Sequence, residues 1–250
     1  MTPDWVVTPA HALAPGVVAM TICRTGPGAS RGVYAQCNLG MGGDDAATVQ
    51  ANRAAVCDAL ALPTAPRWLR QVHGTSVIDL DRHDTPDAAA DAARTTRPGT
   101  VCAVLTADCL PLLVAARDGS AVAAIHAGWR GLAAGVIEAT LQSLALPGSA
   151  LAVWLGPAIG ATAYEVGEDV REAFVDHEVQ AQTCFTPTRP GHWLCDLYAL
   201  ARLRLRAHGV REIQGGEHCT HRDAERFYSY RRDGACGRMA SLIWITPHAS

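Results

Sequence analysis

Residues 101–131 have the sequence VCAVLTADCLPLLVAARDGSAVAAIHAGWRG, and they contain the clearest strand pattern of the chain. Residues 101–106 and 121–126 are almost continuously apolar, which predicts strands buried on both faces. Residues 111–116 are expected to continue in an extended conformation, and Asp118-Gly119 is a turn signal. This stretch therefore predicts neighbouring strands inside a hydrophobic core.

Helix and strand patterns alternate on both sides of this stretch. Apolar residues at helical spacing predict helices, and short apolar runs between turn residues predict strands. The alternation indicates an α/β (α+β) fold with a single domain over residues 1–250. We expect helices over residues 46–60, 132–144, 169–176 and 197–208, further strands over residues 17–23, 68–72, 77–79, 151–155, 210–214 and 242–245, and irregular structure over residues 81–100 and 184–193.

The composition excludes some classes of function. The net charge is −3 and all 21 basic residues are arginine, so no nucleic-acid-binding or membrane-binding surface is indicated. The chain has no apolar run long enough to span a bilayer and no basic signal-peptide region. Its nine cysteines are irregularly spaced, which favours reduced thiols in a cytoplasmic protein.

Three predicted strands end in residues that bind metals, namely His73, Cys109 and His126. One thiolate and two imidazoles are a typical zinc ligand set, and three protein ligands leave a fourth position open for water or substrate. Zinc in such a site lowers the pKa of its bound water or polarises a substrate oxygen. Asp108, beside Cys109, is a candidate acid or base or a residue that orients a ligand.

The same residues allow a second mechanism. Cys109 and His126 are able to form a thiolate–imidazole pair of the kind used by cysteine hydrolases. His73 distinguishes the two alternatives, because a zinc site needs it as a ligand and a dyad does not. The residues alone leave both hypotheses open.

Several motifs together resemble the YfiH family, also called the laccase-domain or "polyphenol oxidase" family. The motifs are QVHG (71–74), TADCLPLL (106–113), HAGWRG (126–131), GPAIG (156–160), YEVG (164–167) and FYSYRRDGACGRMA (227–240). The resemblance implies central mixed β-sheets flanked by helices, a fold shared with deamidating toxins that use a Cys–His dyad. It also implies a zinc site at His73, Cys109 and His126.

The activity that the resemblance implies is phosphorolysis of adenosine, inosine and 5′-methylthioadenosine, together with adenosine deamination. The expected partners are therefore a purine nucleoside and phosphate, and the chain is expected to be a monomer or a small homo-oligomer. Two alternatives remain. One is a Cys–His hydrolase that edits peptidoglycan precursors, as some members of the family are described, and the other is the copper-dependent polyphenol oxidase of older descriptions.

Oxidase chemistry fits the sequence poorly. Multicopper oxidases need many histidine ligands in paired His-x-His motifs together with a blue-copper site. This chain has ten histidines in total and no His-x-His pair. We therefore expect zinc as the metal, with copper as the less favoured alternative.

Phosphorolysis requires cationic groups that hold phosphate, and without lysine this role falls to arginine. Arg130 is the first candidate because it follows the ligand His126 by four residues, and Arg53, Arg231 and Arg232 are further candidates. Asn38, in a glycine-rich segment, is a candidate for binding ribose hydroxyls or phosphate. For deamination, Asp108 is expected to move protons.

Overall fold

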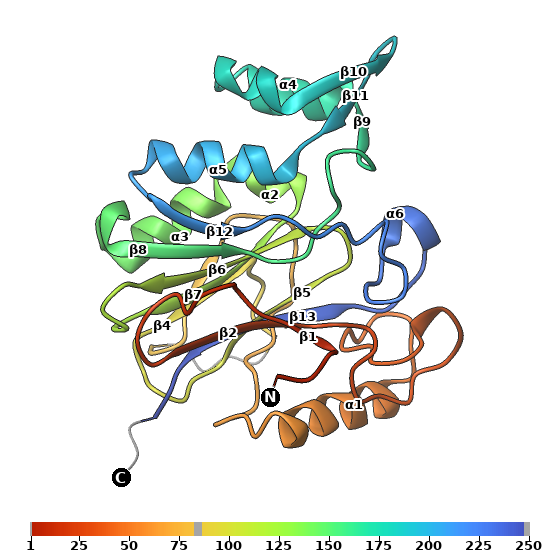
Figure 1. The fold of residues 1–250 in the computed structure, drawn as a ribbon, viewed down its shortest axis with the longest axis vertical. Coiled ribbons are helices and arrows are strands. Elements are labelled where there is room, and N and C mark those ends of the chain that lie inside the picture. The colour runs from red at the N-terminus through yellow and green to blue at the C-terminus, as the bar shows by residue number, and fades with distance from the viewer. Residues whose placement is uncertain (1, 83–86, 248–250) are drawn as a thin grey trace.

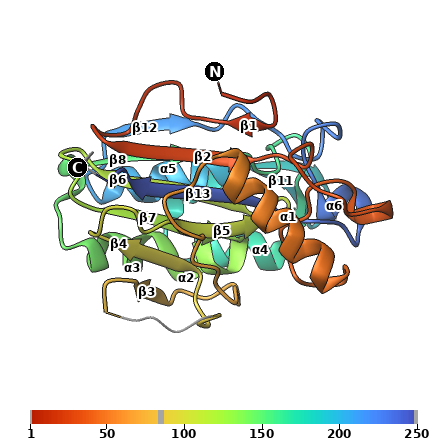
Figure 2. The same ribbon diagram turned by 90° about the horizontal axis from the view of Figure 1, so that it is seen from below.

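Two β-sheets packed face to face form the centre of the protein in a computed structural model that describes residues 2–82 and 87–247. The antiparallel four-stranded sheet has the order β1 (Val6–Val7), β2 (Val17–Ile22), β13 (Met239–Ile245) and β5 (Cys102–Thr106). The six-stranded sheet has the order β12 (Glu212–Gly215), β8 (Leu151–Leu155), β6 (Leu110–Ala116), β7 (Val122–Ala127), β4 (Ala92–Thr95) and β3 (Val77–Asp79), which Figure 2 shows from one side. This sheet is mixed, since only its two outermost strand pairs are parallel.

Apolar side chains fill the space between the two sheets. Val104 and Ile243 of the four-stranded sheet belong to the same buried cluster as Leu113, Ala124 and Trp154 of the six-stranded sheet. Every residue of β7 and all of β5 except Leu105 are buried, which confirms the prediction that these two strands are covered on both faces. β6, which was expected only to be extended, is fully buried as well.

Helices cover the outer faces of both sheets (Figure 1). α2 (Trp129–Ala134), α3 (Val136–Leu144) and α5 (Leu197–Ala207) lie on the six-stranded sheet, and α1 (Ala46–Ala59) lies on the four-stranded sheet. Asp45 caps α1 by accepting a hydrogen bond of 2.8 Å from the Thr48 backbone N–H. None of the helices in the described ranges is long and apolar enough to cross a membrane.

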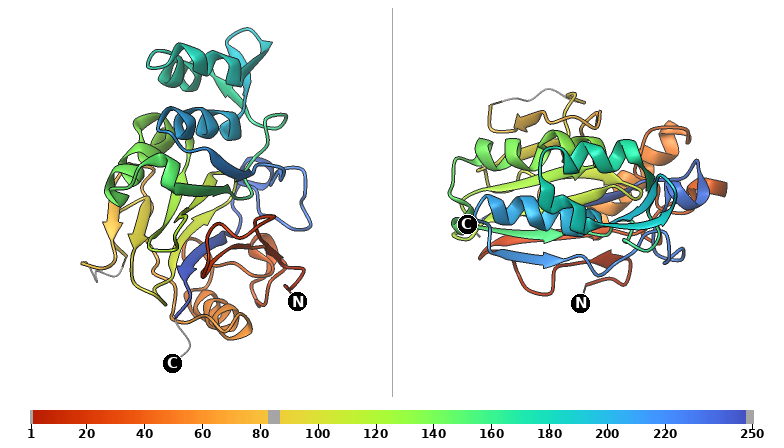
Figure 3. Two further views of the ribbon diagram at one scale, coloured as in Figure 1. Left: turned by 60° about the vertical axis from the view of Figure 1, so that its left-hand side comes forward. Right: turned by 90° about the horizontal axis from the view of Figure 1, so that it is seen from above.

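A smaller unit projects beyond α5 at one end of the molecule (Figures 1 and 3). It consists of the antiparallel strands β10 (Phe185–Arg189), β11 (His192–Cys195) and β9 (Glu165–Gly167), with α4 (Glu168–Val175) beside them. The remaining helices are short: η1 (Gly32–Tyr34), η2 (Gly148–Ala150), η3 (Val179–Cys184) and α6 (Tyr230–Asp233).

The expected fold class, mixed sheets flanked by helices, is confirmed, but four local predictions were wrong. Residues 68–72 form no strand and only isolated bridges at Arg67 and Arg70. The segment 81–100, of which residues 83–86 lie outside the described residues, contains β4, and residues 184–193 contain most of a hairpin. The single helix expected over 132–144 is instead two, because Gly135 has a φ of 101°.

The hydroxyl of Tyr198 joins the GPAIG segment (156–160) to the segment that contains His218. It accepts a hydrogen bond of 2.7 Å from the Ala158 N–H and donates toward the His218 carbonyl at 2.9 Å.

Tyr198→Phe leaves these backbone groups without the hydroxyl partner, so we expect a loss of about 1–3 kcal/mol in the free energy of unfolding. Denaturant unfolding measures the loss, and Tyr230→Phe, at a side chain that is 60% exposed, serves as the control. Equal stability of the two variants would contradict the prediction.

Candidate functional site

Three metal-binding side chains meet beside the ends of β5 and β7. Cys109 lies in the turn between β5 and β6, His126 lies in β7, and His73 follows the segment that was expected to be a strand. That segment is attached to β5 by the Gln71 side chain, whose amide makes two 2.7 Å hydrogen bonds with the backbone of Leu105. The ligand atoms of the three residues all lie within 4.8 Å of one another.

The buried carboxylate of Asp91 orients two of these three residues. Its Oδ1 accepts hydrogen bonds from Nδ1 of His126 at 2.8 Å and from the backbone N–H of His73 at 2.9 Å. Its Oδ2 accepts from the backbone N–H groups of Gly74 at 2.7 Å and Val72 at 3.2 Å. Because Nδ1 of His126 is occupied, its Nε2 is the nitrogen left to bind a metal.

The donor set fits zinc. Tetrahedral zinc with usual bond lengths to sulfur and nitrogen separates such donors by about 3.5 Å. The distance between Cys109 Sγ and His73 Nε2 is 3.8 Å, and the His73 and His126 rings lie edge to face with centroids 4.7 Å apart. Small side-chain movements therefore suffice for these three residues to bind one ion.

Gly128, at the start of α2, leaves room for the ligands. A Cβ at this position would lie 2.6 Å from Cδ2 of His73 and 3.1 Å from Sγ of Cys109. The first glycine of the HAGWRG motif is thus required by the close approach of the backbone to the metal-binding side chains.

A pocket of about 650 Å³ opens over the ligands, within the usual size range of small-molecule sites. Arginines Arg130, Arg231 and Arg238 line it. The Arg130 guanidinium lies 4.3 Å from the ring centroid of Trp129, and that of Arg231 lies 4.9 Å from the ring centroid of Tyr164. The pocket therefore offers cations and aromatic faces next to the metal-binding residues.

Asp108 also lines the pocket, but both of its carboxylate oxygens already accept hydrogen bonds. Oδ1 accepts from the Thr220 hydroxyl at 2.6 Å, and Oδ2 accepts from the backbone N–H of Arg231 at 2.7 Å. Of the five candidate arginines and acids, the structure thus brings three together here beside the ligands, namely Asp108, Arg130 and Arg231.

Asn38 is 1% exposed, and its side chain faces the protein rather than the pocket. Its Oδ1 accepts from the N–H groups of Gly40 and Arg238, while its Nδ2 donates to the Gly40 carbonyl and to Asp44. All the hydrogen-bonding capacity of the amide is used in this way. Asn38 shapes the wall to which Gly40 contributes, and it presents no free group to a ribose or phosphate.

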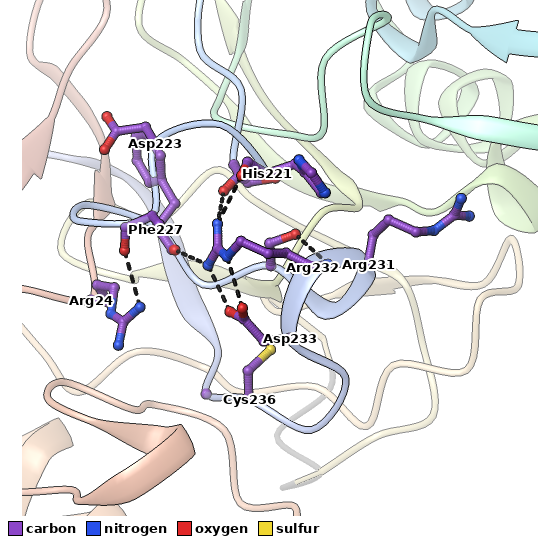
Figure 4. A network of polar contacts seen from close by, with 12 residues as sticks. Arg24, His221, Asp223, Phe227, Arg231, Arg232, Asp233 and Cys236 are labelled. Atoms are coloured by element: carbon purple, nitrogen blue, oxygen red, sulfur yellow. Dashed lines mark hydrogen bonds and ion pairs between the residues drawn. The ribbon is translucent and has the colours of Figure 1, made fainter.

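The side chains of Arg53 and Arg232 also do not line the pocket. Arg53 donates through Nε and Nη2 to the Leu39 carbonyl and lies 4.1 Å from the ring centroid of Trp68. Arg232 pairs with Asp233 of α6 and donates to the Thr220 carbonyl in the loop before α6, while the side chain of Arg231 extends to the opposite side (Figure 4). Both of these candidates therefore hold loops together.

Sequence reasoning missed Asp91, Gln71 and Arg238. Asp91 lies in the segment 81–100, which was expected to be irregular, and nothing in its neighbourhood marks a buried carboxylate. Arg238 lies in the FYSYRRDGACGRMA motif, so the motif could have pointed to it, but only Arg231 and Arg232 of this motif were candidates for binding phosphate.

The surroundings of Cys109 and His126 shift the pKa values of both side chains. Burial raises the pKa of the Cys109 thiol, but hydrogen bonds with His126 and His73 outweigh it and lower the pKa to about 6. Burial lowers the pKa of His126, yet its hydrogen bonds with Asp91 and Cys109 raise it to about 9. Without a metal, these directions indicate a thiolate–imidazolium pair, in which the thiolate is already the form that binds zinc.

Comparison with known proteins identifies close relatives over nearly the whole chain. The profile of the family described as multi-copper polyphenol oxidoreductase laccase matches residues 18–246. A purine nucleoside phosphorylase of Pseudomonas aeruginosa is 47% identical over 98% of both chains. The purine nucleoside phosphorylase YfiH of Escherichia coli is 48% identical over 92% of this chain and 94% of its own.

Solved structures show the same arrangement. The crystal structure of a Neisseria meningitidis protein of family DUF152 has a TM-score of 0.93 and 43% identity, covering 98% of this chain and all of its own (100%). YlmD from Geobacillus stearothermophilus has a TM-score of 0.86 and 30% identity, with 98% and 100% covered.

Gly128→Ala should weaken zinc binding. The added methyl group overlaps His73, so one ligand must move, and we expect the affinity for zinc to fall by about 10- to 100-fold. Titration of the metal-free protein with zinc in the presence of a competing chelator measures the change. Gly42→Ala is the control, because a Cβ at Gly42 meets no atom within 4 Å. Unchanged zinc affinity of Gly128→Ala would show that the close approach does not constrain the ligands.

Ultraviolet absorbance of the metal-free protein tests the thiolate. As the pH is raised, the absorbance of the thiolate band should increase with a midpoint near the Cys109 pKa of about 6. This increase should be absent in Cys109→Ser. Asp91→Asn removes the carboxylate that favours protonated His126, so the thiolate loses its cationic partner and its midpoint should move to higher pH. A midpoint that is the same in both proteins would exclude this role of Asp91.

Proposed function

Because the chain belongs to the family described as multi-copper polyphenol oxidoreductase laccase, which includes YfiH, we propose that it is a zinc-dependent purine nucleoside phosphorylase. The names of its curated relatives support the reaction class. The observation that carries the proposal is the juxtaposition of the His73, Cys109 and His126 set with arginines in one pocket. That combination suits a substrate with an anionic part and a group that coordinates a metal.

Phosphorolysis breaks the bond between the ribose C1′ and the purine nitrogen and forms a bond from C1′ to a phosphate oxygen. In the proposed reaction the guanidinium groups of Arg130 and Arg231 bind the phosphate, since arginine stays charged and pairs with two oxygens at once. The aromatic faces of Trp129 and Tyr164 border the same space. The leaving purine takes up a proton, which the site must supply from a bound group or from water.

His73, Cys109 and His126 would hold the zinc ion, which supplies Lewis acidity or a water of lowered pKa to whichever substrate group faces it. Asp91 keeps the His126 ring in the orientation in which its Nε2 points toward Cys109. The proposal extends to adenosine, inosine and 5′-methylthioadenosine as substrates and to deamination of adenosine as a second reaction. A cytoplasmic location stays a prediction and rests on the composition.

A second candidate function uses the same residues without a metal. Asp91 hydrogen-bonds to the His126 ring, the ligand atoms of His126 and Cys109 lie within 4.8 Å of each other, and the thiol of Cys109 has a lowered pKa, as in a cysteine hydrolase. Such an enzyme would act on an acyl or amide bond, of the kind found in peptidoglycan precursors. His73 separates the candidates, because only the zinc enzyme requires it as a ligand.

Product analysis with adenosine, with and without phosphate, tests the proposal. We expect adenine and ribose 1-phosphate only when phosphate is present, and inosine when deamination occurs. His73→Ala and Cys109→Ala should each lose zinc and reduce phosphorolysis by about 100-fold or more, since each removes one of three ligands.

The hydrolase predicts a different result for His73→Ala, which should keep full activity, whereas Cys109→Ala should lose it. The zinc phosphorylase would be overturned if the purified protein were active without zinc and the two variants behaved in this way. Zinc content, measured on each variant, keeps loss of metal separate from loss of folding.

A further inference from the structure

The carboxylate of Asp108 joins two segments that are distant in the sequence. Asp108 stands directly before the ligand Cys109 and has a φ of 89°, in the left-handed region that non-glycine residues rarely adopt. Its two oxygens accept one hydrogen bond each, from the side chain of Thr220 and from the backbone of Arg231. The strained backbone therefore aims the carboxylate at the C-terminal loop.

The two partners of Asp108 are themselves held firmly. Thr220 is fully buried, and its N–H donates to the Ala158 carbonyl at 3.0 Å. Arg231 lies in the first turn of α6, whose start is capped by Ser229. On the other side of α6, the Arg232 side chain closes the loop by donating to the carbonyls of Thr220, His221 and Phe227 (Figure 4).

The side chain of Arg231 is fixed at its far end as well. Its Nη1 donates to the Glu165 carbonyl at 2.6 Å, and its guanidinium lies over the ring of Tyr164. The residue thus spans from the Asp108 carboxylate, which holds its backbone, to β9, which holds its tip. The remaining N–H groups of the guanidinium are available on a side chain that lines the pocket.

We infer that Asp108 is a positioning residue, which fixes the backbone of α6 so that the guanidinium of Arg231 stands over the metal-binding residues. Each of its oxygens accepts from a group that is itself held in place, the Thr220 hydroxyl on one side and the Arg231 backbone N–H on the other, which is the arrangement of a residue that fixes structure. The kinetic part of the test rests on the proposed function, whereas the structural part does not.

Asparagine at position 108 separates positioning from proton transfer. Its carbonyl oxygen is able to accept from the Arg231 N–H, and its amide donates to the Thr220 hydroxyl, which rotates to accept. Asp108→Asn therefore keeps both links and cannot carry a proton. Asp108→Ala loses both links, and Thr220→Val loses one of them.

Amide hydrogen exchange of the segment 228–236 gives the readout that does not depend on activity. We expect faster exchange in Asp108→Ala and near wild-type exchange in Asp108→Asn. Arg231→Ala is the matched control, because it removes the guanidinium and keeps the backbone N–H that Asp108 binds. Equal exchange in wild type and Asp108→Ala would overturn the inference, whatever reaction the protein catalyses.

The kinetic readout is phosphorolysis at matched zinc content. We expect kcat/KM for phosphate to fall by about 100-fold in Asp108→Ala, because the Arg231 guanidinium is displaced. In Asp108→Asn it should fall by less than about tenfold. Combining Asp108→Ala with Arg231→Ala should cost little more than Arg231→Ala alone, because both changes act through one guanidinium. Asp108→Asn and Asp108→Ala that are equally impaired, by about 100-fold or more, would identify Asp108 as a proton carrier instead.

The two proposals fail in different ways. A wild-type protein that forms no product in the presence of phosphate refutes the phosphorylase, and the exchange experiment then still decides the role of Asp108. A wild-type protein that is active, with an α6 segment as well protected in Asp108→Ala as in wild type, refutes only the positioning role.

Discussion

One buried carboxylate, that of Asp91, holds the candidate site together. It binds the His126 ring and also three consecutive backbone N–H groups beginning at Val72. His73 belongs to a segment with no regular secondary structure of its own, and its backbone has a φ of 59°. Because hydrogen bonds to a charged acceptor contribute about 1.5–3 kcal/mol each, Asp91 stabilises this segment in a conformation it would not otherwise keep.

The position of Asp91 follows from the sheet. It directly precedes β4, which pairs with β7, and the His126 N–H donates to the Asp91 carbonyl at 2.7 Å. Backbone pairing thus places the carboxylate and the imidazole side by side. The metal ligands are consequently fixed by strand register on one side and by the Asp91 carboxylate on the other, which is how a rigid core preorganises a catalytic centre.

The sequence predicts the strongly buried strands and picks out His73, Cys109 and His126, whose side chains meet in the structure, and it fails where the signal is not apolar. β10 is almost wholly exposed and β4 is built from Ala, Arg and Thr, so neither has the pattern of a buried strand. Likewise, histidine and cysteine are visible in a sequence as residue types that bind metals. The partners of Asn38, Arg53 and Arg232, in contrast, depend on loops that only tertiary structure defines. An arginine that binds a carbonyl and one that binds a substrate look the same in a sequence.

The donor set also bears on the chemistry implied by the family's laccase description. Electron transfer through several copper ions requires several clusters of ligands, and among the described residues His73, Cys109 and His126 are the one group of three suited to a metal. Around this group the pocket presents Arg130, Arg231 and Arg238, which attract anions. A single metal position next to fixed guanidinium groups suits the stabilisation of negative charge on a bound substrate, and this is the requirement of group transfer to phosphate rather than of oxidation.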